Sequence, residues 1–136
     1  MTTTKKYQLI RSTAKRVDGH TVYRIRALRD FGNVGMGTGV KKGDRGGYIQ
    51  KHANLSHSGK AWIFDNAKVF GDAKVSGNAL IFGNAWIFGE ARVYGDAEVS
   101  DNAWVYGKAK VFGDAMITDK ARVYDTTNIS NGRWFR

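Results

Sequence analysis

Residues 61–129 repeat a pattern of apolar and polar positions every six residues. Alanine opens each unit, and Ile or Val follows two positions later. An amphipathic helix would repeat about every 3.6 residues, so a strict period of six excludes a helix and predicts short strands. The alanines are Ala61, Ala67, Ala73, Ala79, Ala85, Ala91, Ala97, Ala103, Ala109, Ala115 and Ala121; the partners are Ile63, Val69, Val75, Ile81, Ile87, Val93, Val99, Val105, Val111, Ile117 and Val123, with Thr127 and Ile129 as an imperfect continuation.

Each hexad reads as a short strand followed by a corner. The Ala and the Ile or Val are two positions apart, so both point to the same side of a strand. Gly or Asp follows, usually with Asn, Asp, Lys or Glu after it, and such pairs favour turns. Three hexads then form one triangular coil of 18 residues, with the β-branched side chains in its interior.

This pattern resembles that of the hexapeptide-repeat, left-handed β-helix family, which is best known from acyltransferases. The resemblance implies an all-β fold, a left-handed parallel β-helix of about four triangular coils. The segment 46–56 also resembles the first coil of small hexapeptide-repeat proteins of bacteria and their phages, whose functions are mostly unassigned. We therefore divide the chain into an N-terminal head (residues 1–47), a β-helix (48–130) and a C-terminal tail (131–136).

The head is predicted to contain a β-hairpin over residues 7–28 and a Gly-rich loop over 30–47. Asp18-Gly19 is a strong signal for a two-residue hairpin turn. On the return strand, arginines alternate with residues that suit a packed face, so one side should be basic. The hairpin is expected to cap or flank the first coil, and the tail aromatics Trp134 and Phe135 to cover the last coil or contact a neighbouring subunit.

The net charge of +10 lies entirely in the N-terminal part of the chain. Residues 1–60 hold 13 Lys and Arg against 3 acids, whereas residues 61–136 hold 9 of each. Concentrated positive charge attracts anionic partners, and here it is interleaved with aromatic residues. We therefore take nine head residues as candidates for binding a nucleic acid, a nucleotide or an acidic protein surface: Arg11, Lys15, Arg16, Arg24, Arg26, Arg29, Lys41, Lys42 and Arg45.

Outward-facing aromatic residues are the unusual feature of the repeats. The residues that flank each Ile or Val point outward, and residues 18 apart stack on one face. Exposed apolar surface of this extent marks an interface, and members of the resembling family commonly form trimers, so we expect a homotrimer. The alternative is a head that folds back over one face. The interface candidates are Trp62, Phe64, Phe70, Phe82, Trp86, Phe88, Trp104, Tyr106 and Tyr124, with Trp134 in the tail.

The third face of the coil carries a ladder of cations, Lys74, Arg92 and Lys110. Such a ladder suits a phosphate backbone. Because Asp72 and Glu90 lie at the preceding corners, we expect them to neutralise it in part, and we interpret the ladder as an ordinary solvated face.

No catalytic site, metal site or cofactor is predicted. The chain has no cysteine and three histidines, His20, His52 and His57. The resembling acyltransferases use a histidine base in a cleft between subunits, beside a long loop, and the uninterrupted hexads contain neither. Residual catalysis at His52 or His57 would need pairing across an interface. Zinc needs several converging ligands, which this spacing does not supply.

We expect a non-enzymatic, homo-oligomeric binding module in the cytoplasm, whose basic head engages an anionic partner. The sequence shows no secretory signal and no apolar run that could span a membrane, so no membrane contact is predicted. The phage-type resemblance adds, by analogy alone, a phage-encoded inhibitor of a host system in the bacterial cell. An acyltransferase-like enzyme and a purely structural spacer or virion component are the alternatives.

Overall fold

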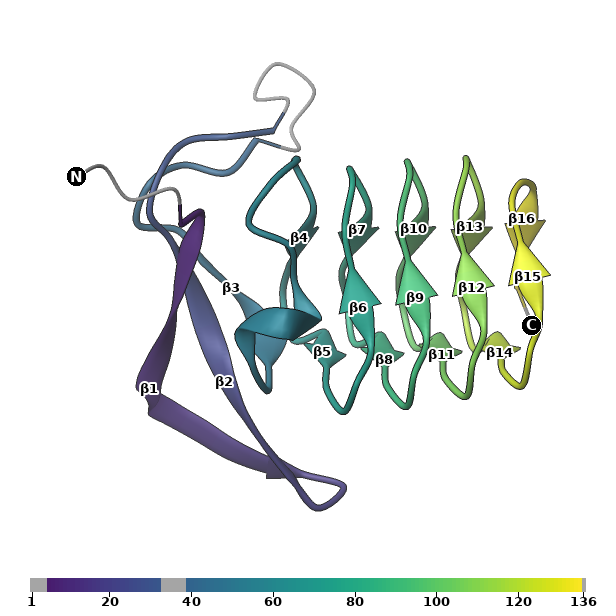
Figure 1. Ribbon diagram of the computed structural model, residues 1–136, viewed down its shortest axis with the longest axis horizontal. Helices are drawn as coiled ribbons and strands as arrows, with labels where there is room; N and C mark the ends of the chain where they lie inside the picture. Colours follow the sequence, from purple (N-terminus) through teal and green to yellow (C-terminus); the bar gives the residue numbers. More distant parts are fainter. Residues whose placement is uncertain (1–4, 33–38, 136) are drawn as a thin grey trace.

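The computed structural model describes residues 5–32 and 39–135, which form a parallel β-solenoid with a head at one end (Figure 1). The head contains β1 (Tyr7–Val17), β2 (His20–Ala27) and β3 (Arg45–Ile49), followed by the short 3₁₀ helix η2 (His52–Asn54). The solenoid strands are each two residues long: β4 (Trp62–Ile63), β5 (Lys68–Val69), β6 (Lys74–Val75), β7 (Leu80–Ile81), β8 (Trp86–Ile87), β9 (Arg92–Val93), β10 (Glu98–Val99), β11 (Trp104–Val105), β12 (Lys110–Val111), β13 (Met116–Ile117), β14 (Arg122–Val123), β15 (Asn128–Ile129) and β16 (Arg133–Trp134).

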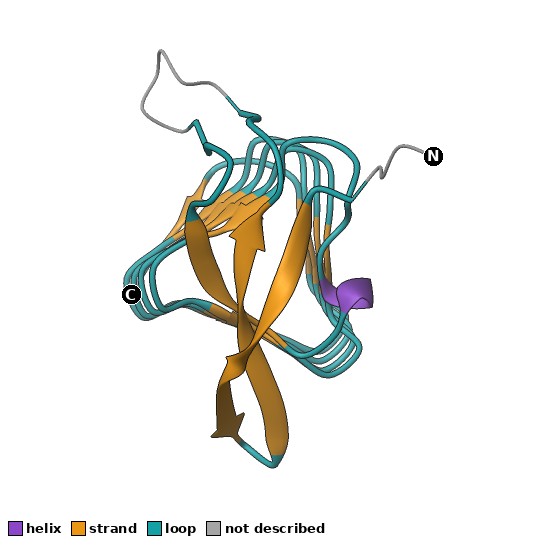
Figure 2. Ribbon diagram, turned by 90° about the vertical axis from the view of Figure 1, so that its left-hand side faces the viewer, coloured by secondary structure: helices purple, strands orange, loops and turns teal. Residues whose placement is uncertain are grey.

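The solenoid strands stack into three sheets, which Figure 2 shows end-on as the sides of a triangle. The first face is β4-β7-β10-β13-β16 and the third is β6-β9-β12-β15. The second face, β5-β8-β11-β14, continues through β3 into β2 and β1 as one sheet. From β4 to β15, paired residues are 18 apart, as in Lys68–Trp86, so the predicted faces are confirmed. The left hand of the coil stays an expectation from the resemblance.

The corners require a backbone conformation with positive φ, which explains why the fifth position of each hexad is either Gly or Asp. Gly71 and Asp101 adopt φ values of 67° and 58°, in the left-handed region that glycine enters freely and aspartate tolerates. Inside the coil, every Ala and Ile/Val of the repeats from residue 61 to 117 is exposed by at most 1 %. The predicted interior is therefore confirmed.

The predicted hairpin is confirmed, with its turn at Asp18 and Gly19. The assignment of Gly46 and Gly47 to a loop is wrong, because both lie in β3, which pairs with β2 and with β5. The strand passes very close to the first coil: a Cβ on Gly47 would lie 2.5 Å from the Ala67 carbonyl oxygen. The 47/48 boundary thus falls inside a strand. Residues 33–38 of the predicted loop lie outside the described residues.

The tail adds a strand to the first face. β16 pairs in parallel with β13, which places Trp134 beside Ile117 at an inward position of a further coil. The first face therefore has five strands, and the structure has about five coils where about four were predicted. Trp134 is 49 % exposed because no described coil follows it.

Candidate functional site

Three head and solenoid cations gather around one tyrosine ring. The charged groups of Arg24, Lys15 and Lys68 lie 4.5, 5.5 and 5.2 Å from the centroid of Tyr48. No described carboxylate forms an ion pair with any of them. Burial, followed by the charges of Lys15 and Arg24, lowers the pKa of Lys68, as expected for cations held together.

Sequence reasoning missed Lys68. Its position is visible only once β3 is recognised as the strand that precedes β5, because Tyr48 and Lys68 are register partners. We call Lys15, Arg24, Tyr48 and Lys68 the cation–tyrosine cluster.

Arg24 is held by the chain itself. Its guanidinium donates hydrogen bonds to the carbonyl oxygens of Gly46 and Asp65 and to the side-chain oxygen of Asn66. Because these three hydrogen bonds fix the planar guanidinium group in place, Arg24 attaches the head to the first coil. Of the cluster cations, Lys15 is the one that is both exposed and on the head.

The other head candidates are dispersed. Arg11 lies over the ring of Tyr23 at 4.8 Å, and Arg16 donates to the Thr21 hydroxyl. Arg26 and Arg45 are opposite each other in the β2–β3 pair. Arg29 donates to the His57 carbonyl oxygen, and Lys41 and Lys42 lie exposed on the loop before β3. The nine candidates therefore do not form one site.

The second face carries a continuous ladder of aromatic rings. Trp86 and Trp104 stack at 5.0 Å with an interplanar angle of 4°. Beside them, the second column stacks at 4.9–5.4 Å and contains Phe70, Phe88, Tyr106 and Tyr124. At one end of the first column, the guanidinium carbon of Arg122 lies 4.4 Å from the centroid of the Trp104 ring. We call these six aromatic residues the aromatic ladder. Its rings lie face to face within one chain, so they offer mainly their edges to a partner.

Two interface candidates are buried within the chain, which corrects their assignment. Trp62 is packed against Phe31 and Tyr7 of the head, and Phe70 packs with Val17, Val22 and Tyr48; each is 1 % exposed. The described residues of the head thus fold back over the first coil of the solenoid. Phe64 and Phe82 meet edge to face on the first face and stay half-buried. Trp86, Phe88, Trp104 and Tyr106 are half-buried, and Tyr124 is 46 % exposed.

A buried polar cluster joins β1 to the first coil. Lys6 is fully buried and donates to the Ala61 carbonyl oxygen at 2.6 Å, and burial, with the charge of Arg29, lowers its pKa to about 8. The Tyr7 hydroxyl donates to the Leu55 carbonyl oxygen, and burial raises its pKa. The ring of Tyr7 stacks on His57 at 4.0 Å.

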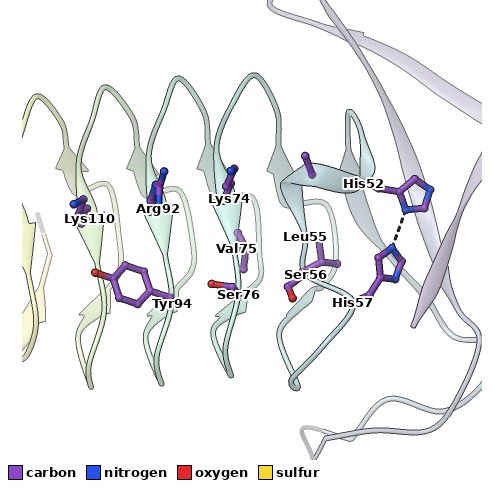
Figure 3. A pocket seen from close by; sticks show the side chains of 11 residues that line it. His52, Leu55, Ser56, His57, Lys74, Val75, Ser76, Arg92, Tyr94 and Lys110 are labelled. Atoms are coloured by element: carbon purple, nitrogen blue, oxygen red, sulfur yellow. Dashed lines mark hydrogen bonds between the residues drawn. The ribbon is translucent and has the colours of Figure 1, made fainter. Parts of the chain in front are cut away.

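The geometry fixes the two histidines as neutral. Nδ1 of His57 accepts the backbone N–H of Lys6 at 3.0 Å, so it carries no proton. Its Nε2 then donates to Nδ1 of His52 at 2.9 Å. Burial and the charges of His52, Lys6, Lys5 and Arg29 lower the pKa of His57 to about 4; burial, Lys5 and Arg11 also lower the pKa of His52. Both rings are turned toward each other and the head (Figure 3).

We expect the protein to lose stability as the pH falls from 7 to 5. Above the unfolded pKa of 6.5, His57 is neutral in both states; between 6.5 and about 4 only the unfolded chain takes up the proton, which favours unfolding. Carboxylates titrate mainly below about pH 5, outside this window. Urea unfolding at pH 7 and 5 measures the loss. His57→Phe, which keeps a ring on Tyr7 without a titrating group, should reduce the pH dependence; an unchanged dependence would show that His57 is not its source.

Beside the histidines, η2 and the following loop overhang a groove on the third face (Figure 3). The groove has a volume of about 470 Å³, and Leu55 and Val75 contribute to its lining. Lys74, Arg92 and Lys110 form a row along it, because β6, β9 and β12 are in register. The expected partial neutralisation by Asp72 stays a prediction: Asp72 lines a hollow beside Lys74, but its ion pair, at 3.0 Å, is with Lys51. We call this hollow the cationic groove.

Comparisons with known proteins support the repeat and no particular activity. A family model described as YdcK Beta solenoid repeat matches residues 91–107, about one coil. No curated protein matches the chain. Within the described residues, no three His, Cys, Asp or Glu side chains are grouped to hold a metal ion, and no helix is long and apolar enough to cross a membrane.

Proposed function

We propose that this β-solenoid is a non-enzymatic, homo-oligomeric binding module whose basic head engages an anionic partner through charge. The observation that carries the proposal is the cation–tyrosine cluster, in which Lys15, Arg24 and Lys68 surround one ring without a paired carboxylate among the described residues. Cations held together in this way raise the local potential and attract anions.

The arrangement of the aromatic residues favours recognition of charge over recognition of bases. Single-stranded nucleic acids are bound by stacking each base on a free aromatic face. Here Arg11 lies over Tyr23 and three cations surround Tyr48, while the rings of the aromatic ladder stack on each other. A nucleic-acid backbone or an acidic protein surface therefore fits the head better than a splayed-out base.

Apart from Phe70, which the head buries, the aromatic ladder is the surface that we assign to self-association. Its rings are in register and continue beyond the part that the head covers. A trimer and a role as a phage-encoded inhibitor are the parts of this proposal that rest on the resemblance alone, whereas a cytoplasmic location is proposed from the sequence.

The proposal is tested by removing exposed head charges. We expect the triple variant Arg11→Gln, Lys15→Gln, Arg16→Gln to bind a random-sequence DNA duplex or a poly-glutamate chain at least about tenfold more weakly than the wild type, in fluorescence anisotropy at about 50 mM salt. The wild-type affinity should fall steeply by about 200 mM salt. Which probe binds more tightly identifies the class of partner.

The matched control removes the same charge at the other end of the solenoid, in Lys108→Gln, Lys120→Gln, Arg133→Gln. All three residues lie outside the head, on the later coils. Equal losses in the two triple variants would mean that net charge alone acts and would contradict a head-specific site.

A further inference from the structure

The cationic groove presents hydrogen-bond donors on two sides. Lys74, Arg92 and Lys110 occupy neighbouring parallel strands, so their Cα atoms are spaced about 4.8 Å apart along the solenoid. All three side chains are exposed. Ser76 and Tyr94, two residues after Lys74 and Arg92, line the other side together with Ser56. Figure 3 shows the hydroxyl groups of Ser76 and Tyr94 across from the cations.

The row keeps most of its positive charge. No carboxylate lines the groove, and among the described residues none forms an ion pair with any of the three cations. Asp72 and Glu90 line an adjoining hollow behind Lys74 and Arg92, but Asp72 is held by Lys51. Of the two carboxylates that line the adjoining hollow, Glu90 is the one for which no ion pair is formed with a described cation.

The head adds positive potential at the closed end. His52 and His57 border the groove there, and Lys5, Lys6, Arg11 and Arg29 lie near enough to disfavour protonation of these imidazoles. An anion that enters the groove therefore meets cations along one side and, at the end next to the head, the positive potential of the head.

We propose that the cationic groove is a binding site for a chain of linked phosphate groups, such as the triphosphate of a nucleotide or inorganic polyphosphate. Linked phosphates carry closely spaced negative charges in a line and several acceptor oxygens for each one. They match a row of Lys and Arg faced by hydroxyl donors, because charge-assisted hydrogen bonds to phosphate are the strongest that such groups make. This site is separate from the head cluster and does not depend on the head's partner.

The test is isothermal titration calorimetry of the full chain with inorganic tripolyphosphate, ATP, orthophosphate and hexaglutamate, in EDTA at about 0.1 M salt. We expect tripolyphosphate and ATP to bind, and orthophosphate to bind at least tenfold more weakly because it meets one cation at a time. Equal affinities for tripolyphosphate and ATP would identify the phosphate chain as the whole ligand; tighter binding of ATP would identify a nucleotide. Hexaglutamate binding as tightly as tripolyphosphate, or no binding of tripolyphosphate, would overturn the proposal.

Variants separate the groove from the rest of the surface. Arg92→Gln, at the centre of the row, should weaken tripolyphosphate binding about tenfold or more, and Arg92→Lys should retain part of it. Lys120→Gln, an exposed cation away from the groove, should bind it as the wild type does, and so should the double head variant Lys15→Gln, Arg16→Gln, which leaves Arg11 in place. Equal weakening by Lys120→Gln would show a diffuse charge effect and overturn the site. Arg92 is exposed, and unchanged circular dichroism and melting confirm that its variants are folded. Weaker binding of DNA or poly-glutamate by this double head variant, with tripolyphosphate binding intact, keeps the two proposals distinguishable.

Discussion

Gly47→Ala is expected to lower the free energy of unfolding by about 3 kcal/mol, as overpacking against atoms that cannot move aside does. The added Cβ would lie 2.5 Å from the Ala67 carbonyl oxygen and 2.7 Å from Cγ2 of Ile63. The first contact is with backbone, so either β3 must move away from β5 or the first coil must distort. Since β3 is the strand that joins the head to the solenoid, the head should loosen first.

Urea unfolding followed by circular dichroism measures the effect. The matched control is Gly19→Asn, at the hairpin turn, where φ is +81° and no atom lies within 4 Å of the added Cβ. Asparagine tolerates that conformation, so the control should unfold close to the wild type. A Gly47→Ala protein as stable as the control would mean that the head is not packed against the first coil as described.

Replacing the two stacked tryptophans, Trp86→Gln with Trp104→Gln, is expected to convert the oligomer into a monomer. Their rings form the centre of the aromatic ladder, and aromatic residues at the centre of an interface contribute most of its affinity. The fold should tolerate the change, because Lys68 and Arg122 already occupy the same register position in the neighbouring coils. The mass from sedimentation velocity should fall to that of the 15.1 kDa chain.

The control for this variant is Tyr94→Gln with Phe112→Gln, which removes a similarly stacked pair on the third face. Both double variants lose one stacked pair, worth about 1 kcal/mol of fold stability. The tryptophan variant also loses edge contacts with neighbouring rings and the contact of Arg122 with Trp104, so its melting temperature is measured beside that of the control. A difference in mass between two folded variants then reports the interface. An oligomer that survives the tryptophan changes but not the control changes would place the interface on the third face.

The solenoid could be predicted from sequence because its constraints are local and repeated. Each hexad must put one β-branched residue inside and one left-handed residue at the corner, as Val105 and Gly107 do, and this leaves a mark every six residues. The register follows from the same period, since a spacing of 18 residues is enough to place Trp86 beside Trp104, where the two are paired.

The head could not be predicted to the same depth because its constraints are not local. Gly47 is required by a close approach to Ala67, 20 residues later, and a Gly-rich stretch alone reads as a loop. The bond from Lys6 to the His57 ring spans 51 residues, and the burial of Trp62 and Phe70 depends on where the hairpin docks. For the same reason, the sequence predicts the row of cations along the groove. It does not predict that residues 52–57 border one end of the groove, or that Asp72 pairs with Lys51.

The central claim, a homo-oligomer that binds anions, is tested most directly by light scattering of the wild-type protein at about 0.15 M and 1 M salt, with and without the DNA duplex or poly-glutamate. Salt screens charge contacts but not apolar ones. We predict an oligomer that persists at both salt concentrations and gains mass from an anionic probe only at the lower one. A trimer would have the mass of three 15.1 kDa chains. A 15.1 kDa monomer that takes up neither probe would contradict both the role of the aromatic ladder and that of the head.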